Sequence, residues 1–480
     1  MLIGIDVGTT AVKAALFDAG GQVLRRFGER YPTTRPRPGH VEQDPALWID
    51  LVGRALASLS DGVTITAVGL CSQVNTHVFC DEAGKALLPA FTWQDTRCAE
   101  DAASLDAKVA FDDKIRWWRA PLPVDASHVL ARMAHVARAA PEVWARARFV
   151  MAPKDYCIFH LTGEAIADPM TNFGILDQDL ALITPLLDLV PGAAERLPRI
   201  AGFTAPAGRI RAGLPCAGVP VVTGAMDAWS GLLGAGLSED GQGLYLSGTS
   251  EILGILSHAR APTPGVIAFA ECEGMVLHAG PTQSGGASLD WLSRLLGKTP
   301  AELAALAASA DLRHVPLFLP HLDGERAPLW DAGARGSFTG LTSATGPAEL
   351  SLAVLEGVAY SARLVFDSLK QSASREAEVI HHAGGGAASD LWCQIRADVL
   401  GRPLRRTAMR DAGVLGAALM AGVGAGVFPS LAQATRDFVQ FDAAFTPRAV
   451  AAPRHDRRFE AYRLAYENHR ALNSLLATAG

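Results

Sequence analysis

Two short turns, Gly8-Thr9-Thr10 and Gly248-Thr249-Ser250, contain the residue types that bind phosphate groups. Glycine lets the backbone approach an anion closely, and neighbouring N–H and hydroxyl groups can then surround it. A third turn, Gly384-Gly385-Gly386, follows the apolar pair Val379-Ile380 and precedes a helix-like stretch over 389–400, which also favours anions. Any one of these turns could equally be an ordinary β-turn.

The established nucleotide motifs do not account for these turns. Gly297-Lys298-Thr299 has the ending of a P-loop, but Leu292 stands where the first glycine is required. Gly422-Val423-Gly424 is followed by Val427 in place of the third glycine of GxGxxG. The sequence therefore supports neither a P-loop nor a Rossmann site.

The two Gly-Thr turns belong to a repeat. Segments 4–12 and 244–252 align at an offset of 240 residues, half of the chain, and each has a strand, a Gly-Thr turn and a second strand. A hairpin repeated at this distance indicates two similar domains that face each other, which we place at residues 1–235 and 236–480. Only the first copy has an acid inside its strand, Asp6.

Strands and helices alternate around these turns, which predicts an α/β fold. Apolar and turn patterns predict strands over 2–7, 11–17, 22–30 and 63–70. Helical periodicity extends over 46–59, 127–138, 141–148, 289–296, 300–308, 347–371 and 454–476.

Composition excludes several classes of protein. With 480 residues, 49% hydrophobic and 19% charged, the chain is neither disordered nor collagenous and can form two or three domains. A net charge of −6 argues against a protein that binds nucleic acid. The longest apolar stretch, 414–428, is too short and too glycine-rich to span a bilayer. No signal peptide is readable, and seven scattered cysteines without CxxC spacing indicate reduced thiols. We expect a cytoplasmic protein without a membrane partner.

Dispersed motifs over nearly the whole chain resemble those of the FGGY family of carbohydrate kinases. In chain order they are Gly4 to Thr10, Trp93 to Arg97, Pro153 to Tyr156 with Leu161 to Glu164, Gly224 to Asp227, Leu246 to Ser250, Gly324 to Pro328, Ala334 to Leu341, Leu355 to Gly357 and Gly384 to Trp392. The resemblance implies two actin-like, ribonuclease-H-like ATPase domains with ATP in the interdomain cleft. It also implies transfer of the γ-phosphoryl group of ATP to a sugar or polyol hydroxyl, with Mg²⁺.

The resemblance gives two aspartates the central roles. Asp227 matches the catalytic base and Asp6 the acid that organises metal and phosphates, so both are expected near the metal. Phosphoryl transfer requires positioning, charge neutralisation and a carboxylate within reach of the attacking hydroxyl. The alternative for each is a turn or cap residue, the commoner use of aspartate beside glycine or serine.

The nucleotide residues implied by the resemblance fall on four segments. Thr9, Thr10 and Lys13 match the first phosphate segment, and Gly248 and Thr249 the second. A ribose and phosphate-facing stretch is matched by Gly286 and Asp290, and the adenosine-binding turn by Gly385 and Ser389. Lys13 could equally be a solvated strand lysine.

On the sugar side the resemblance implies contacts from Gln73, Val74, Asn75, Trp93 and the base Asp227. Xylulokinases have Gly-Gln-Met-His-Gly and glycerol kinases Asn-Gln-Arg-Glu-Thr where this chain has 72–76, so Val74 and Asn75 fit neither. The missing Arg-Glu pair argues against glycerol. Ala228 also departs from the Asn or Gln that usually follows the base. We place His77 on the same side of a strand as Asn75, as a second polar contact or a satisfied structural histidine.

These observations predict ATP-dependent phosphorylation of a small sugar, a ketopentose such as xylulose, with ATP and Mg²⁺ as cofactors. Ribulose or a short polyol is the alternative substrate. A non-catalytic, actin-like protein that binds sugar and ATP is the alternative from another class. The choice between monomer and homodimer stays open.

Overall fold

The structure, a computed structural model, describes residues 1–478 and separates into two compact units. Unit 1 contains Met1–Ser238, Phe269–Val276 and Asp411–Val439. Unit 2 contains Glu239–Ala268, Leu277–Arg410 and the described residues from Gln440 onward. The segment Asp411–Val439 thus packs in unit 1 although it lies far beyond position 235. Each unit combines one large sheet with helices, which confirms the α/β prediction.

The sheet of unit 1 positions the first Gly-Thr turn. Its strands lie in the order β11-β12-β5-β1-β2-β3, and β13 also pairs with β5. Their bounds are β11 Pro206–Arg209, β12 Pro220–Val222, β5 Ala67–Ser72, β1 Leu2–Val7, β2 Ala11–Phe17, β3 Val23–Arg30 and β13 Ala225–Met226. The prediction of a strand over 63–70 was wrong in its bounds. Because β5 pairs with β1 from Leu2↔Ala67 to Val7↔Ser72, the partner strand sets both ends.

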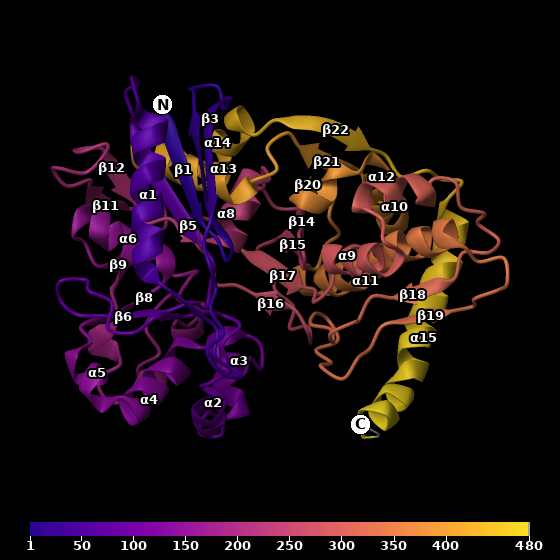
Figure 1. Ribbon diagram of the computed structural model, residues 1–480, viewed down its shortest axis with the longest axis horizontal. Helices are drawn as coiled ribbons and strands as arrows, with labels where there is room; N and C mark the ends of the chain where they lie inside the picture. The colour runs from indigo at the N-terminus through magenta and orange to yellow at the C-terminus, as the bar shows by residue number, and fades with distance from the viewer. Residues whose placement is uncertain (479–480) are drawn as a thin grey trace. The chain divides into compact units, whose positions relative to one another are not determined.

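A helix covers each face of this sheet. α1 (Pro45–Ser60) lies beside β1 (Figure 1), and its Trp48 and Leu51 join Ile3 and Ile5 in one apolar core. On the other face α13 (Ala412–Gly424) packs directly on the strand backbones, because a Cβ on Gly4 would lie 1.9 Å from the Val414 carbonyl oxygen. The apolar stretch 414–428, which is too short to span a bilayer, therefore lies mostly in the core helix α13. Within residues 1–478 no helix is long and apolar enough to cross a membrane.

The remaining α-helices and strand pairs of unit 1 lie outside the large sheet, and several of these helices pack around a second apolar cluster. They are α2 (Ala99–Asp106), α3 (Phe111–Trp118), α4 (Val129–Ala139), α5 (Pro141–Arg146), α6 (Pro153–Thr162), α7 (Thr184–Leu187), α8 (Asp227–Gly234) and α14 (Leu431–Phe438), with the strand pairs β4 (Glu42–Gln43) and β7 (Ala90–Phe91), β6 (Val78–Cys80) and β8 (Phe149–Met151), and β9 (Ile166–Ala167) and β10 (Arg199–Ile200).

Unit 2 has its own sheet in the order β16-β17-β15-β14-β20-β21-β22. The strands are β16 (Ile267–Ala268), β17 (Leu277–Pro281), β15 (Glu251–Leu256), β14 (Gln242–Ser247), β20 (Val379–Ala383), β21 (Leu404–Thr407) and β22 (Phe441–Phe445). Helices α11 (Pro347–Ala373) and α12 (Asp390–Leu400) share an apolar core with it. The helices are α9 (Gly286–Leu296), α10 (Pro300–Ala307), α11 (Pro347–Ala373), α12 (Asp390–Leu400) and α15 (Ala452–Thr478), and β18 (Leu317–Leu319) pairs with β19 (Ser337–Thr339).

The sequence repeat is also a structural repeat. β14 begins 240 residues after β1 (242 − 2), and β15 begins 240 residues after β2 (251 − 11). In both units the first strand of the hairpin pairs antiparallel with the second, and parallel with a later strand, β5 or β20. The prediction of two similar domains is confirmed at the level of this topology.

Candidate active site

Asp6 and Asp227 lie at the carboxyl ends of two parallel strands of the unit 1 sheet, β1 and β13, which both pair with β5. Asp6 is opposite Cys71 in the β1–β5 ladder, while Met226, opposite Ser72, immediately precedes Asp227 at the start of α8. Burial, and then the nearby negative charge of Asp227, raise the pKa of Asp6 to about 7. Burial likewise raises the pKa of Asp227 to about 6, against a hydrogen bond that its Oδ1 accepts from the Ala228 N–H at 2.8 Å. The structure thus brings the two predicted acids together.

Two contacts fix the short strand β13, which ends directly before Asp227. Gly224 has a φ of +69°, and a Cβ there would lie 1.9 Å from the Leu70 carbonyl oxygen, so only glycine fits this approach of β13 to β5. The ammonium group of Lys154 donates to the Thr223 carbonyl oxygen at 3.1 Å. That ammonium is fully buried between Asp155 at 2.5 Å and Asp168 at 2.7 Å. The sequence places Lys154 in a family motif but gives no sign of its link to the base.

The two aspartates provide donors of the type that Mg²⁺ requires. In the part of the chain that the structure describes, no group of three or more His, Cys, Asp or Glu side chains is placed to hold a metal. However, Asp6 Oδ1 is buried without a hydrogen-bond partner among residues 1–478. Magnesium is commonly held by one or two carboxylates together with substrate phosphates and water. Asp6 and Asp227 therefore fit an ion that arrives with a nucleotide.

Neighbouring side chains hold the first Gly-Thr turn in place by hydrogen bonds. Thr9 accepts hydrogen bonds from Gln43 Nε2 at its carbonyl oxygen (2.7 Å) and from Trp93 Nε1 at its hydroxyl (3.2 Å). Thr10 is exposed at the tip of the hairpin. Lys13 lies opposite Asp6 in the β1–β2 ladder, and its half-exposed ammonium is 2.7 Å from Asp411. Lys13 is thus an ion-paired strand residue next to the turn.

Gln73 connects the predicted sugar segment to this turn. Its Nε2 donates to Gln43 Oε1 at 2.8 Å, and Gln43 in turn donates to Thr9. Both glutamines are buried, and Gln73 Oε1 has no hydrogen-bond partner among the described residues. Sequence reasoning missed Gln43, because a lone glutamine before a helix carries no signal of its own.

The prediction that Asn75 and His77 share one side of a strand was wrong. Asn75 lies in a bend with a φ of +53°, and β6 begins only at Val78. A bend forms because Asn tolerates this left-handed conformation, and Nδ2 of Asn75 donates to Ser127 Oγ at 3.1 Å. His77 is buried beside the Arg132 guanidinium at 2.9 Å, and burial lowers its pKa well below the usual range. His77 is therefore a structural histidine. Val74 is partly exposed next to Asn75.

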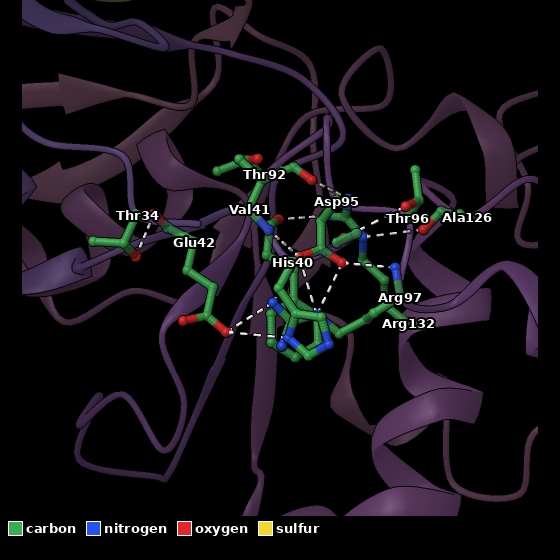
Figure 2. Close-up of polar contacts among 12 residues, drawn as sticks. Thr34, His40, Val41, Glu42, Thr92, Asp95, Thr96, Arg97, Ala126 and Arg132 are labelled. Carbon is green, nitrogen blue, oxygen red and sulfur yellow. Dashed lines mark hydrogen bonds and ion pairs between the residues drawn. The ribbon is translucent and has the colours of Figure 1, made fainter. Parts of the chain in front are cut away.

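A polar cluster holds the segment that contains Trp93. Figure 2 shows Asp95 between the N–H of Val41, at 2.6 Å, and the guanidinium of Arg97, which also reaches Glu42 at 2.7 Å. Buried Arg132, which sequence reasoning missed, donates to the Phe91 and Thr92 carbonyl oxygens. The backbone on both sides of Trp93 is thereby fixed, although the residue itself is 44% exposed.

Unit 2 gathers its three glycine turns around the end of β14. Gly286 N–H donates to the Gly248 carbonyl oxygen at 2.8 Å, and Gly285 N–H to that of Thr249 at 2.9 Å. A Cβ on Gly384 would lie 2.3 Å from the Ser247 carbonyl oxygen. The structure therefore brings the predicted nucleotide residues of this unit close to one another.

The outer surface of these turns is accessible. Gly248 and Thr249 are exposed, and a Cβ on Gly385 would meet no atom within 4 Å. Asp290 is exposed on α9, one turn after Gly286. Ser389 caps α12 by accepting the Trp392 N–H at 3.3 Å.

Comparison with known proteins assigns the family. Residues 1–234 match the FGGY family of carbohydrate kinases, N-terminal domain, and residues 243–425 match its C-terminal domain. A xylulose kinase of Escherichia coli K12 is 30% identical over 97% of this chain and 99% of its own length.

Solved structures give the same assignment. A ligand-bound xylulose kinase from Lactobacillus acidophilus superposes with a TM-score of 0.89 at 26% identity over 99% of both chains. A gluconate kinase from the same organism has a TM-score of 0.89 at 26% identity, over 100% of this chain and 99% of its own. The predictions of family, fold and a phosphotransferase with an alcohol acceptor are confirmed, and the chain belongs to the FGGY family of carbohydrate kinases.

Proposed function

We propose that the protein transfers the γ-phosphoryl group of ATP to a hydroxyl of a ketopentose, xylulose foremost. The observation that carries this proposal is the pair of carboxylates, Asp6 and Asp227, at the carboxyl ends of the parallel strands beside the first Gly-Thr turn. The names of the xylulose kinases from E. coli and L. acidophilus support the choice of sugar.

In this mechanism Asp227 is the general base. Its pKa of about 6 leaves the carboxylate ionised at neutral pH, yet basic enough to accept the proton of the attacking sugar hydroxyl. The sugar oxygen forms a bond to the γ-phosphorus while the bond from phosphorus to the β–γ bridging oxygen breaks, and ADP leaves. We assign the phosphates to the N–H and hydroxyl groups of Thr9, Thr10, Gly248 and Thr249, with Lys13 as a neighbouring cation.

Asp6 and Asp227 would hold Mg²⁺, and when bound the ion neutralises phosphate charge. The negative charge of Asp227 contributes to the raised pKa of Asp6, so a bound cation would offset the repulsion between these two carboxylates. We assign the adenosine side to Gly286, Asp290, Gly385 and Ser389.

Gln73, Val74, Asn75 and Trp93 would contact the sugar. Gln73 Oε1 lacks a partner among residues 1–478 and suits a sugar hydroxyl as donor. Ribulose, a short polyol or, from the name of the second L. acidophilus structure, gluconate are the competing substrates. The seven cysteines, all free thiols and six of them buried, support action in the cytoplasm.

The test is an ADP-release assay with Mg²⁺–ATP over a panel of ketopentoses, polyols and sugar acids, with Asp227→Asn as the control. We expect the highest kcat/KM for D-xylulose and at least ~10²-fold lower kcat for the variant. Sugar binding by calorimetry without ADP release would support the non-catalytic alternative instead.

A further inference from the structure

Glu251 and Arg396 form a fully buried ion pair beneath the glycine turns of unit 2, with 2.9 Å between Oε1 and Nη2. We infer that this pair is a positioning device for ATP, which fixes the spacing of the 248–249, 285–286 and 384–386 turns. The inference rests on the proposed function, since it takes these turns as the nucleotide site.

Glu251 contacts the first two turns. It is the first residue of β15, directly after the 248–250 turn, and its second carboxylate oxygen accepts a hydrogen bond from Tyr245 of β14 at 3.0 Å. A Cβ on Gly285 would lie 2.4 Å from its Cγ, so the 285–286 turn rests on this side chain. Its backbone also exchanges hydrogen bonds with Thr282, which precedes that turn.

Arg396 contacts the third turn from α12. Its Nη1 donates to the Gly386 carbonyl oxygen at 2.9 Å and approaches His382 Nε2 at 3.2 Å. His382 in turn bonds Ser247 Oγ, the residue before Gly248, at 2.7 Å. One cation therefore links the 384–386 turn to the hairpin through both Glu251 and His382.

Aromatic rings hold the guanidinium in place. Its carbon lies 4.0 Å from the ring centre of Trp392 and 4.7 Å from that of Tyr245. Trp392 donates through its indole to the Leu355 carbonyl oxygen in α11, so the stack is anchored to the core of the unit. Arg396 has little freedom to move without moving a turn.

Stability alone is a poor explanation for this arrangement. Apolar residues of similar volume commonly stabilise a core as well as a buried ion pair does, because desolvation offsets the attraction. Here, however, Arg396 donates directly to the Gly386 carbonyl oxygen of one turn, and the Glu251 side chain packs against Gly285 of another. Small displacements of positioning groups have large effects on binding and rate. A pair of apolar side chains lacks directional hydrogen bonds and would not hold the turns against such displacements.

The test compares variants of this pair with a matched control. Arg396→Met removes the cation, and Glu251→Leu with Arg396→Met removes both charges, so the double variant carries no unpaired buried charge. Arg454→Met is the control, since Arg454 pairs with buried Glu356 between α11 and α15 and contacts none of the three turns. Calorimetry gives the Kd for a non-hydrolysable ATP analogue, and steady-state assays give the KM for the best sugar.

We expect both pair variants to weaken analogue binding ~10-fold or more and to leave the sugar KM within about twofold. Arg454→Met should lower Tm without changing the Kd. If Arg396→Met fails to fold, the double variant decides. Wild-type affinity in a folded pair variant would overturn the inference while leaving the proposed function intact. Wild-type protein that releases no ADP with any sugar would overturn the proposed function, and the inference with it.

Discussion

The indole Nε1 of Trp93 donates a hydrogen bond to the hydroxyl of Thr9 at 3.2 Å, across 84 residues of sequence. The predicted sugar segment and the first Gly-Thr turn therefore touch directly. A second path between the same segments passes from Gln73 through Gln43 to the Thr9 carbonyl oxygen. The predicted sugar segments and the first Gly-Thr turn of unit 1 are thus parts of one hydrogen-bonded network.

Replacing Trp93 by Phe should affect both substrates. Phe keeps an aromatic face for the sugar but cannot donate to Thr9, and a neutral hydrogen bond contributes about 0.5–1.5 kcal/mol. We expect the KM for ATP to rise ~2–10-fold together with the KM for sugar. Trp330→Phe is the matched control, because Trp330 is similarly exposed and donates to the Gly265 carbonyl oxygen. An unchanged KM for ATP in Trp93→Phe would show that this hydrogen bond does not affect ATP binding.

Replacing Asp227 by Asn should remove the acidic limb of the pH–rate profile. The pKa of Asp227 is about 6, so kcat/KM of the wild type should rise with pH through that value as the base ionises. Asn keeps the hydrogen bond from Ala228 but accepts no proton, so kcat should fall at least ~10²-fold and lose this limb. Stopped assays from pH 5 to 8.5 measure both. If the acidic limb of the pH–rate profile persists in Asp227→Asn, the group that ionises near pH 6 is not Asp227.

Local sequence predicted the strand that carries Asp6, because strand and turn chemistry are visible within a few residues. The helix over 347–371 and the hairpin repeat were visible for the same reason. The short strand and helix at Asp227 were not predicted, and Asp227 was found only through the family resemblance. The supports of the site were not visible, since they join distant segments. Lys154 reaches Thr223 over 69 residues and Arg396 reaches Glu251 over 145. Asn75 was misplaced because an alternating polar pattern does not reveal a left-handed bend.

The raised pKa of the Asp6 carboxyl group should also make the folding stability depend on pH. Asp6 has a pKa of about 7 in the folded chain against its ordinary value of 3.8, so the folded state binds more protons between these values. Folding stability therefore falls as pH rises through about 4 to 7, and the loss persists above 7. Asp6→Asn removes this ionisation and should melt higher than wild type at pH 8, by ~1–3 °C, with no advantage at pH 4. Calorimetric Tm values at both pH values measure the difference. A variant that melts below wild type at pH 8 would mean that Asp6 is stabilised by its surroundings.

Replacing Lys154 by Met should separate positioning of the base from stability. The variant leaves Asp155 and Asp168 buried without their cation and frees the Thr223 carbonyl oxygen four residues before Asp227. Breaking such a buried pair costs about 3–5 kcal/mol, so Tm should fall. Because Asp227 also loses a support, kcat should fall ~10-fold or more, while the KM for ATP stays near the wild-type value. Lys114→Met is the matched control. Buried Lys114 forms an ion pair with Asp106, with 2.6 Å between Nζ and Oδ1, and this pair does not contact Thr223 or Asp227. We expect the control to lose Tm and keep kcat when assayed well below its melting temperature, and equal kcat losses in the two variants would show that Lys154 acts through stability alone.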